Sequence, residues 1–291
     1  MYEEDILEKK QRTELVLKNV YNLPPMPQVI DETLRLLNSK TSTVRELTAV
    51  IIKDQSLVTK ILSIANSPLY GLQRRVSTID FAVTILGYAE LRNIVLILSM
   101  IESFKNKTDK YLDQKEFWMH SYIVGSACKK LSDDLNLQKS SEAFIAGFLH
   151  DLGVTVMHRY FHSNFITITD LVLNEGMNHL DAEKEILGLT HGEIGTILLE
   201  KWNFPNSLCD PVRFHHTPGK SANKVLASLI HLVDYMTQKF EIGNFKWDEK
   251  IELDEEAIAE LKLIDKNNVD EFIESYRNMF QEQLQNIRLF N

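Results

Sequence analysis

Histidine and acidic residues recur in the second half of this chain at spacings that could build a metal site. Glu116 and His120 stand four residues apart in a stretch of helical periodicity, so both side chains lie on one face of the expected helix. His150 and Asp151 are adjacent, so on a helix their side chains diverge by about 100° and suit two neighbouring ions, which the aspartate could bridge. The apolar run AFIAGFL leads into His150. A carboxylate at the inner end of such a buried helix needs a positive partner.

Further histidines and one aspartate stand at expected helix ends or on apolar helix faces. His191 opens a helix behind Thr190 and Glu193, and Asp234 lies on the apolar face of HLVDYM. Each could instead be an ordinary helix-end or half-exposed residue. Imidazoles and carboxylates supplied by at least five separate helices are, however, the ligands that a two-metal cluster needs. The candidate ligands are Glu116, His120, His150, Asp151, His191, His215, His216 and Asp234.

The metal itself is left open by these residue types. Iron, manganese and zinc all accept imidazole and carboxylate ligands, so the sequence predicts two divalent transition-metal ions of any of these kinds. Four histidines have no spacing that recommends a role, namely His158, His162, His179 and His231. Of these, His231 stands three residues before Asp234 and could orient it, although an ordinary core or surface histidine is the favoured interpretation.

The elements that must position these residues are helices. Apolar residues recur at steps of three and four, and no clear run alternates apolar with polar residues, so the prediction is an all-α protein. Expected helices before residue 105 cover 29–38, 44–53, 56–66, 78–87 and 90–101. Those of the histidine-rich part lie near 113–132, 140–150, 164–174, 181–187, 191–201, 206–215 and 222–239, and a further helix covers 254–288.

Start and stop signals support these ranges. Hydroxyl-x-x-acid patterns predict helix starts at Thr43 with Glu46, Ser77 with Asp80, and Thr190 with Glu193. Predicted stops are Asn66 to Pro68, Gly87, Gly176 and Gly188.

Histidine content divides the chain. All nine histidines lie beyond residue 105, so the preceding part cannot supply an imidazole-rich site. The expected organisation is an N-terminal helix over 1–21, a helical lobe over 22–105, a second lobe with the metal site over 106–240, and a helical C-terminal tail over 241–291.

Composition narrows the classes of function. The formal charge is −9 and argues against binding a nucleic-acid backbone by bulk electrostatics. The apolar run at 94–101 is far shorter than the roughly 20 residues of a membrane span, and MYEEDILEKK lacks the order of a secretory signal. We therefore expect a cytoplasmic protein without a membrane span. Cys128 and Cys209 stand far apart outside any CxxC pattern and are expected to be buried, reduced thiols.

The candidate ligands, taken in order, resemble the ligand series of the HD superfamily of metal-dependent phosphohydrolases, most closely that of the HD-GYP cyclic-dinucleotide phosphodiesterases. Longer motifs resemble the HDOD family, the HD-related output domains: LPPMPQVI at 23–30, LSIANSPLYGL at 62–72, STIDFAVTILG at 77–87, LRNIVL at 91–96, and HGEIGTILLEKWNFP at 191–205 followed by FHHTP. The resemblance covers about residues 20–240. It implies an all-helical N-terminal lobe packed on an HD-like lobe, in bacterial signal transduction without demonstrated catalysis.

Two departures from the HD-GYP pattern bear on catalysis. That pattern continues as HDxGK, and this chain has Val154 at the position of the lysine. The chain also lacks a GYP segment. A cation near a scissile phosphate would stabilise developing charge, so the valine removes a catalytic contribution.

Three interpretations follow from the sequence. The favoured one is a signalling module that binds a protein partner and retains the di-metal centre. The second is a metal-dependent hydrolase of a nucleotide-like phosphoester, with a nucleotide or cyclic dinucleotide as ligand and with Glu116 or Asp234 able to accept a proton. The third is a metal-free helical scaffold. The turn ANSPLYGL, around Tyr70, is a candidate partner surface, although packing between helices is the favoured interpretation of it.

Overall fold

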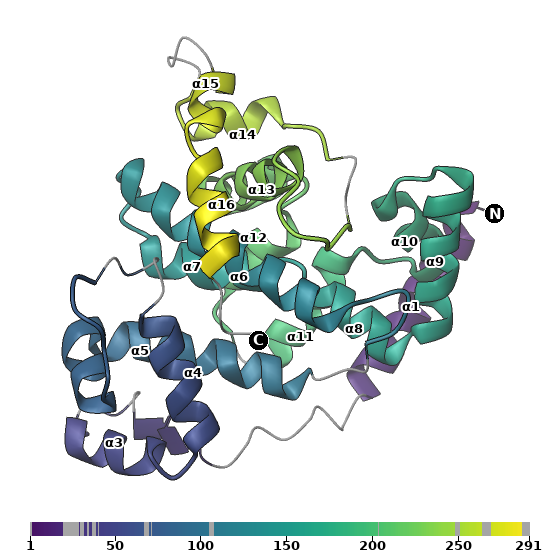
Figure 1. Cartoon of the computed structure of the whole chain (residues 1–291). Coiled ribbons are helices and arrows are strands. Elements are labelled where there is room, and N and C mark those ends of the chain that lie inside the picture. Colours follow the sequence, from purple (N-terminus) through teal and green to yellow (C-terminus); the bar gives the residue numbers. More distant parts are fainter. Residues whose placement is uncertain are drawn as a thin grey trace. The chain divides into compact units, whose positions relative to one another are not determined.

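The protein is all-α in the computed structural model, as predicted (Figure 1). The structure describes residues 2–19, 41–66, 72–104, 108–202, 204–247, 251–263 and 269–286, with isolated positions between 29 and 39 and at 70. No strand occurs in these ranges. The segment LPPMPQVI, the helix expected at 29–38 and the centre of the ANSPLYGL turn lie largely or wholly outside the described residues.

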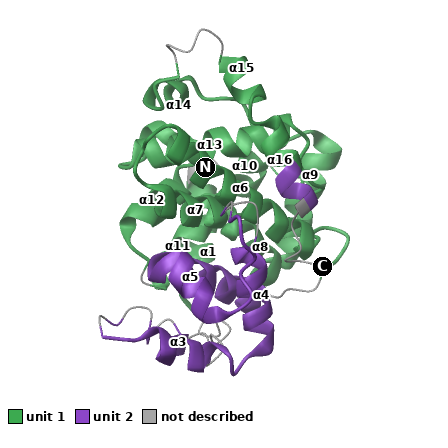
Figure 2. Ribbon diagram, turned by 60° about the vertical axis from the view of Figure 1, so that its left-hand side comes forward, with its two compact units in different colours: residues 1–21, 106–281 green, residues 22–105, 282–291 purple. Residues whose placement is uncertain are grey.

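The chain divides into two compact units (Figure 2). Unit 1 contains residues 1–21 and 106–281, and unit 2 contains residues 22–105 and 282–291. Residues 1–21 and 241–281, which the sequence sets apart as an N-terminal helix and a tail, thus cluster with the histidine-rich lobe. Helix α1 (Tyr2–Asn19) is held there by the Thr13 hydroxyl, which donates to the Leu187 carbonyl over 2.8 Å.

Unit 2 contains α3 (Val44–Ile51), α4 (Gln55–Ala65) and α5 (Ile79–Ser103). The capping box of Thr43 and Glu46 is confirmed at the start of α3. The start predicted at Ser77 is wrong by one residue, because Thr78 caps α5 and its hydroxyl accepts from the Phe81 N–H. The two helices expected on either side of Gly87 are joined in α5 across a kink, where Gly87 takes the left-handed φ of 79°.

Helix α5 is the one described helix long and apolar enough, by length and composition, to cross a membrane. Buried core helices pass the same test. Within unit 2, α5 packs against α3 and α4, and Leu91, Ile94 and Leu98 are buried.

Unit 1 holds the remaining helices. They are α6 (Gln114–Asp134), α7 (Ser140–Leu149), α8 (Leu152–Tyr160), α9 (His162–Glu175), α10 (His179–Leu187), α11 (His191–Lys201), α12 (Asn206–Arg213), the 3-10 turn η2 (Pro218–Lys220), α13 (Lys224–Lys239), α14 (Glu255–Glu260) and α15 (Val269–Glu274), with α16 (Arg277–Asn286) at its boundary. Gly176 and Gly188 end α9 and α10 in the left-handed conformation, as predicted. Helix α8 was not predicted from the sequence. The prediction of a single helix over 254–288 is wrong, because three helices, α14, α15 and α16, occupy this range.

Two glycines allow the close helix contacts that assemble the centre of unit 1. A Cβ on Gly147 of α7 would lie 2.8 Å from the Cys128 sulfur of α6. A Cβ on Gly153 of α8 would lie 1.9 Å from the backbone oxygen of His191 at the start of α11. Because glycine brings no side chain of its own to either contact, α7 approaches α6 and α8 approaches α11 closely enough for their polar residues to meet.

Candidate metal centre

The predicted histidine and aspartate residues come from helix ends and inner helix faces of unit 1. His120 lies on α6 and Asp234 on α13, and both are buried. His150 and Asp151 form the corner where α7 ends and α8 begins, rather than the last turn of one helix. His191 begins α11 behind the confirmed capping box of Thr190 and Glu193. His215 and His216 follow the end of α12.

The Asp151 carboxylate lies between two groups of imidazoles. Its Oδ2 is 3.2 Å from His150 Nε2 and 3.7 Å from His120 Nε2. Its Oδ1 is 3.4 Å from His191 Nε2 and 3.8 Å from His215 Nε2. One carboxylate therefore faces both groups, with a different oxygen toward each.

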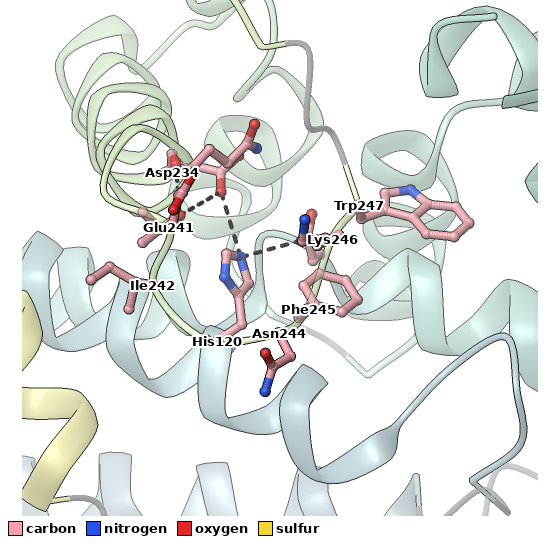
Figure 3. Close-up of a pocket in the computed structure, with 12 residues that line it drawn as sticks. His120, Asp234, Glu241, Ile242, Asn244, Phe245, Lys246 and Trp247 are labelled. Carbon is pink, nitrogen blue, oxygen red and sulfur yellow. Dashed lines mark hydrogen bonds and ion pairs between the residues drawn. The ribbon is translucent and has the colours of Figure 1, made fainter. Parts of the chain in front are cut away.

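Asp234 completes the first group. Its Oδ1 is 3.5 Å from His120 Nε2 and 3.7 Å from His150 Nε2. Figure 3 shows the Asp234 carboxylate directed at the His120 ring from α13.

Three imidazoles form the second group. His191 Nε2 lies 3.2 Å from His215 Nε2 and 3.1 Å from His216 Nε2. Two nitrogens bound to one ion at about 2.0–2.1 Å are expected about 3–3.5 Å apart. The spacing therefore fits a shared ion.

Hydrogen bonds at the ring nitrogens that face away from the centre determine which nitrogen of each histidine carries its lone pair. His150 Nδ1 donates to the Gly147 carbonyl over 2.7 Å, and His215 Nδ1 donates to the Val212 carbonyl over 2.6 Å. Since a carbonyl only accepts, each Nδ1 carries the hydrogen, and in the neutral ring Nε2 presents its lone pair to the centre. His191 Nδ1 bonds the Glu183 carboxylate in the same way, over 2.9 Å.

These tautomers create an electrostatic conflict that a cation would relieve. The Nε2 lone pairs of neutral His191 and His215 face each other at 3.2 Å. Four buried atoms of the centre also have no hydrogen-bond partner in the part of the chain that the structure describes: His120 Nε2, His150 Nε2, Asp151 Oδ1 and Asp234 Oδ2. Buried polar atoms are normally satisfied, so the residues present fit bound metal ions.

Both carboxylates of the centre have lowered pKa values. Burial alone raises the pKa of Asp151, but the nearby His150 and then His191 outweigh burial and hold this pKa below its usual range. Burial likewise raises the pKa of Asp234, and His120 and His150 lower it well below its usual value. Both groups are therefore ionised at neutral pH, as metal ligands must be.

The imidazoles differ from one another. Burial lowers the pKa of His150, yet Asp151 and Asp234 raise it well above the usual value. Burial and the neighbouring His216 and His191 lower the pKa of His215 well below it. His215 is thus neutral without any metal.

Glu116 lies outside both groups. Its Oε2 accepts a hydrogen bond from the backbone N–H of Asn244 over 3.0 Å.

The His231 side chain forms its hydrogen bonds with groups other than Asp234. Its Nδ1 donates to the His215 backbone oxygen over 2.9 Å, and its Nε2 accepts from the Asp254 N–H over 3.0 Å, so it supports the His215 segment.

Two residues next to the centre were missed in the sequence. Glu183 of α10 is fully buried and accepts from both the backbone N–H and Nδ1 of His191. The Trp247 indole N–H donates to the same carboxylate over 2.9 Å. Glu183 shares the inner face of α10 with Ala182 and Leu187, a spacing that could have pointed to burial, but acidic side chains are seldom fully buried, so the pattern alone does not single it out.

A cavity of about 540 Å³ opens onto the first group (Figure 3). His120, Asp151 and Asp234 line one side of it, and residues 241–247, which follow α13, line another. The Phe245 ring stands 5.0 Å from the His120 ring between centroids. Lys246 also lines this cavity, so a positively charged side chain is present there although residue 154 is a valine.

The fold and the centre together define an all-α protein with buried histidines and aspartates of metal-ligand type. The chain belongs to the HDOD family, because the HDOD domain matches residues 23–218. The fold is similar to that of an HDOD domain protein of unknown function from Geobacter sulfurreducens (TM-score 0.78, 21% identity, 98% of this chain and 99% of that chain). It is also similar to a "Putative phosphohydrolase" from Shewanella amazonensis SB2B (TM-score 0.71, 25% identity, 94% of this chain and 97% of that chain).

One curated relative is a protein of Treponema pallidum (strain Nichols) described as uncharacterized, 24% identical over 202 residues. The match covers 69% of this chain and 39% of that relative, so this chain spans well under half of its length. The predicted family and the all-α fold are confirmed by these comparisons.

Proposed function

We propose that the protein is a regulatory module of bacterial signalling that holds two divalent transition-metal ions in unit 1. In this proposal Asp151 would hold both ions, with one oxygen toward each. His120, His150 and Asp234 would complete one ligand set, and His191, His215 and His216 the other. The opposed lone pairs of His191 and His215, 3.2 Å apart and each held by an outer hydrogen bond, carry the proposal.

A role in recognition rather than turnover is supported by α8. Val154 is fully buried there, at the position where the HD-GYP pattern has a lysine. A pair of bound ions would polarise a phosphate oxygen of a substrate. This chain has no positively charged side chain at position 154 to stabilise the negative charge that develops during hydrolysis. In this proposal a signalling protein in the cytoplasm would bind the module and respond to whether its centre is occupied or empty.

Metal analysis of purified protein tests the centre. Wild type should contain tightly bound iron, manganese or zinc, and Asp151→Ala should lose most of it, because both ligand sets share that carboxylate. Asp170→Ala, which removes an exposed carboxylate of α9, is the matched control and should keep the metal. If wild type contains no more metal than Asp151→Ala, the di-metal centre is wrong.

A second candidate function, hydrolysis of a nucleotide-like phosphoester, is favoured by the cavity beside the first group. A volume of about 540 Å³ suits a nucleotide-sized ligand. The Phe245 ring could pack against a base, and Lys246 could bind a phosphate group. In this function His120, Asp151 and Asp234 would hold the metal ion that binds the phosphate, and Asp234 could also accept a proton.

Nucleotides and cyclic dinucleotides, assayed with added manganese or iron(II), test this second function. Turnover should disappear in His150→Ala and in Asp151→Ala and should fall in Lys246→Ala. Activity that survives in both His150→Ala and Asp151→Ala comes from a contaminant. A wild type that binds metal but turns over none of these substrates favours the regulatory role.

A further inference from the structure

A second group of metal-ligand residues lies in unit 1 apart from the centre described above. His158 Nε2 is 3.1 Å from Asp109 Oδ2, and His162 Nε2 is 3.5 Å from the same oxygen. The three ligand atoms lie within 4.8 Å of one another. His158 is in the last turn of α8 and His162 is the first residue of α9, so the corner between these helices brings the two imidazoles together.

The Asp109 carboxylate is held in place before any ion binds. Its Oδ1 accepts from the backbone N–H groups of Tyr111 over 2.8 Å and of Leu112 over 3.0 Å. These two hydrogen bonds fix the carboxylate and leave its second oxygen directed at both histidines.

The His158 ring is equally constrained. It is 5% exposed and packs edge-on against Phe165, with 5.1 Å between ring centroids, and against His162 at 4.9 Å. Its Nδ1 is buried and has no hydrogen-bond partner in the described ranges, whereas its Nε2 faces the Asp109 carboxylate, so Nε2 is the ring nitrogen placed to share an ion with it. Packing fixes the ring, which lowers the entropy that ion binding would cost.

Two imidazoles and one carboxylate form a ligand set for a divalent transition metal with open positions. Non-haem iron sites and catalytic zinc sites use three protein ligands of this kind and leave the other positions to water or a ligand. The side chains of His162 and Asp109 are 48% and 31% exposed, so the remaining positions face solvent.

We propose that Asp109, His158 and His162 form a separate site for one divalent transition-metal ion. The ion ties the segment around Asp109 to the corner of α8 and α9, across 49 residues of sequence. This segment leads into α6, which contains His120, and α8 begins next to Asp151. The ion would therefore stiffen the two elements that deliver ligands to the di-metal centre.

Zinc content of the full chain tests this site. Protein stripped with a chelator is dialysed against a limiting free concentration of Zn²⁺, and bound zinc is measured by mass spectrometry. Asp109→Asn keeps the oxygen that accepts from Tyr111 and Leu112 and weakens the ligand, while His162→Gln removes a ligand at an exposed position. Asp170→Asn on α9 is the matched charge control.

Wild type and Asp170→Asn should bind one zinc per chain more than His162→Gln and Asp109→Asn. Equal zinc content in all four proteins would overturn the proposal. His162→Gln decides the matter if Asp109→Asn fails to fold, and a component of the visible absorption of bound cobalt(II) that is present in wild type and Asp170→Asn and absent in His162→Gln gives a second readout. Asp151→Asn separates this site from the di-metal centre, because it should lose the zinc of the centre and keep the zinc bound by His162.

Discussion

Glu183 and His191 are joined by two hydrogen bonds, one from the His191 backbone N–H over 2.7 Å and one from its Nδ1 over 2.9 Å. This buried pair fixes both the start of α11 and the orientation of the imidazole. A carboxylate behind a metal-binding histidine also raises the basicity of the ring. Glu183 is therefore expected to control the metal affinity of the second ligand set without touching an ion.

Glu183→Gln tests this control. The amide keeps the shape and one acceptor oxygen but loses the charge, so we expect metal affinity to fall about 10–100-fold. Competition with a chromophoric chelator measures it. Glu185→Gln, on the same helix and outside the centre, should bind metal as wild type does. Equal affinity of Glu183→Gln and wild type would show that Glu183 serves the fold alone.

Trp247→Phe tests the hydrogen bond that holds Glu183 from the other side. The variant loses the indole N–H that donates to Glu183 Oε1 but keeps a ring to stack on Phe165. A hydrogen bond to a charged group contributes about 1.5–3 kcal/mol, so the free energy of unfolding should fall by a similar amount. Urea unfolding followed by circular dichroism measures the change. In the double variant with Glu183→Gln the two losses should be less than additive, and strict additivity would exclude a shared interaction.

Gly153→Ala tests the contact of α8 with α11. The new methyl group would meet the rigid backbone of His191 at 1.9 Å, so α8 must move away from α11. We expect a loss of about 3 kcal/mol in the free energy of unfolding together with weaker metal binding, because Asp151 and His191 separate. Gly219→Ala meets only the end of the Glu256 side chain and should change stability little. Similar thermal unfolding of the two variants would contradict the close contact.

Labelling of the two cysteines tests the packing of unit 1. Both are free and buried. Burial, and then Glu200, raise the pKa of the Cys209 thiol to about 11, and burial with Asp234 raises the pKa of Cys128 well above its usual value. A raised pKa keeps a thiol protonated and unreactive, so neither should react with a thiol reagent at pH 8 in the folded protein, and both should react in denaturant. Rapid labelling of the native chain would show that the helices around Cys128 and Cys209 open.

Local signals in the sequence were sufficient for much of the helical structure. The capping boxes at Thr43 and Thr190 were predicted correctly because a cap is an interaction between residues three apart. Residue type and position also singled out the ligand candidates, and seven of the eight lie together in the structure. Glu116 was the exception. Its spacing from His120 could not reveal that its carboxylate accepts a hydrogen bond from the backbone N–H of Asn244.

The sequence by itself determined an all-α chain of the HDOD family and a set of imidazoles and carboxylates suited to metal ions. Only the tertiary structure decided that one oxygen of Asp151 faces each group, that the buried Glu183 holds His191, and that Asp109 meets His158 from 49 residues away. The physical reason is range. Helix periodicity and caps depend on neighbours within about four residues, whereas each of these contacts depends on how closely two helices pack, and that is set by side chains and glycines far apart in the chain.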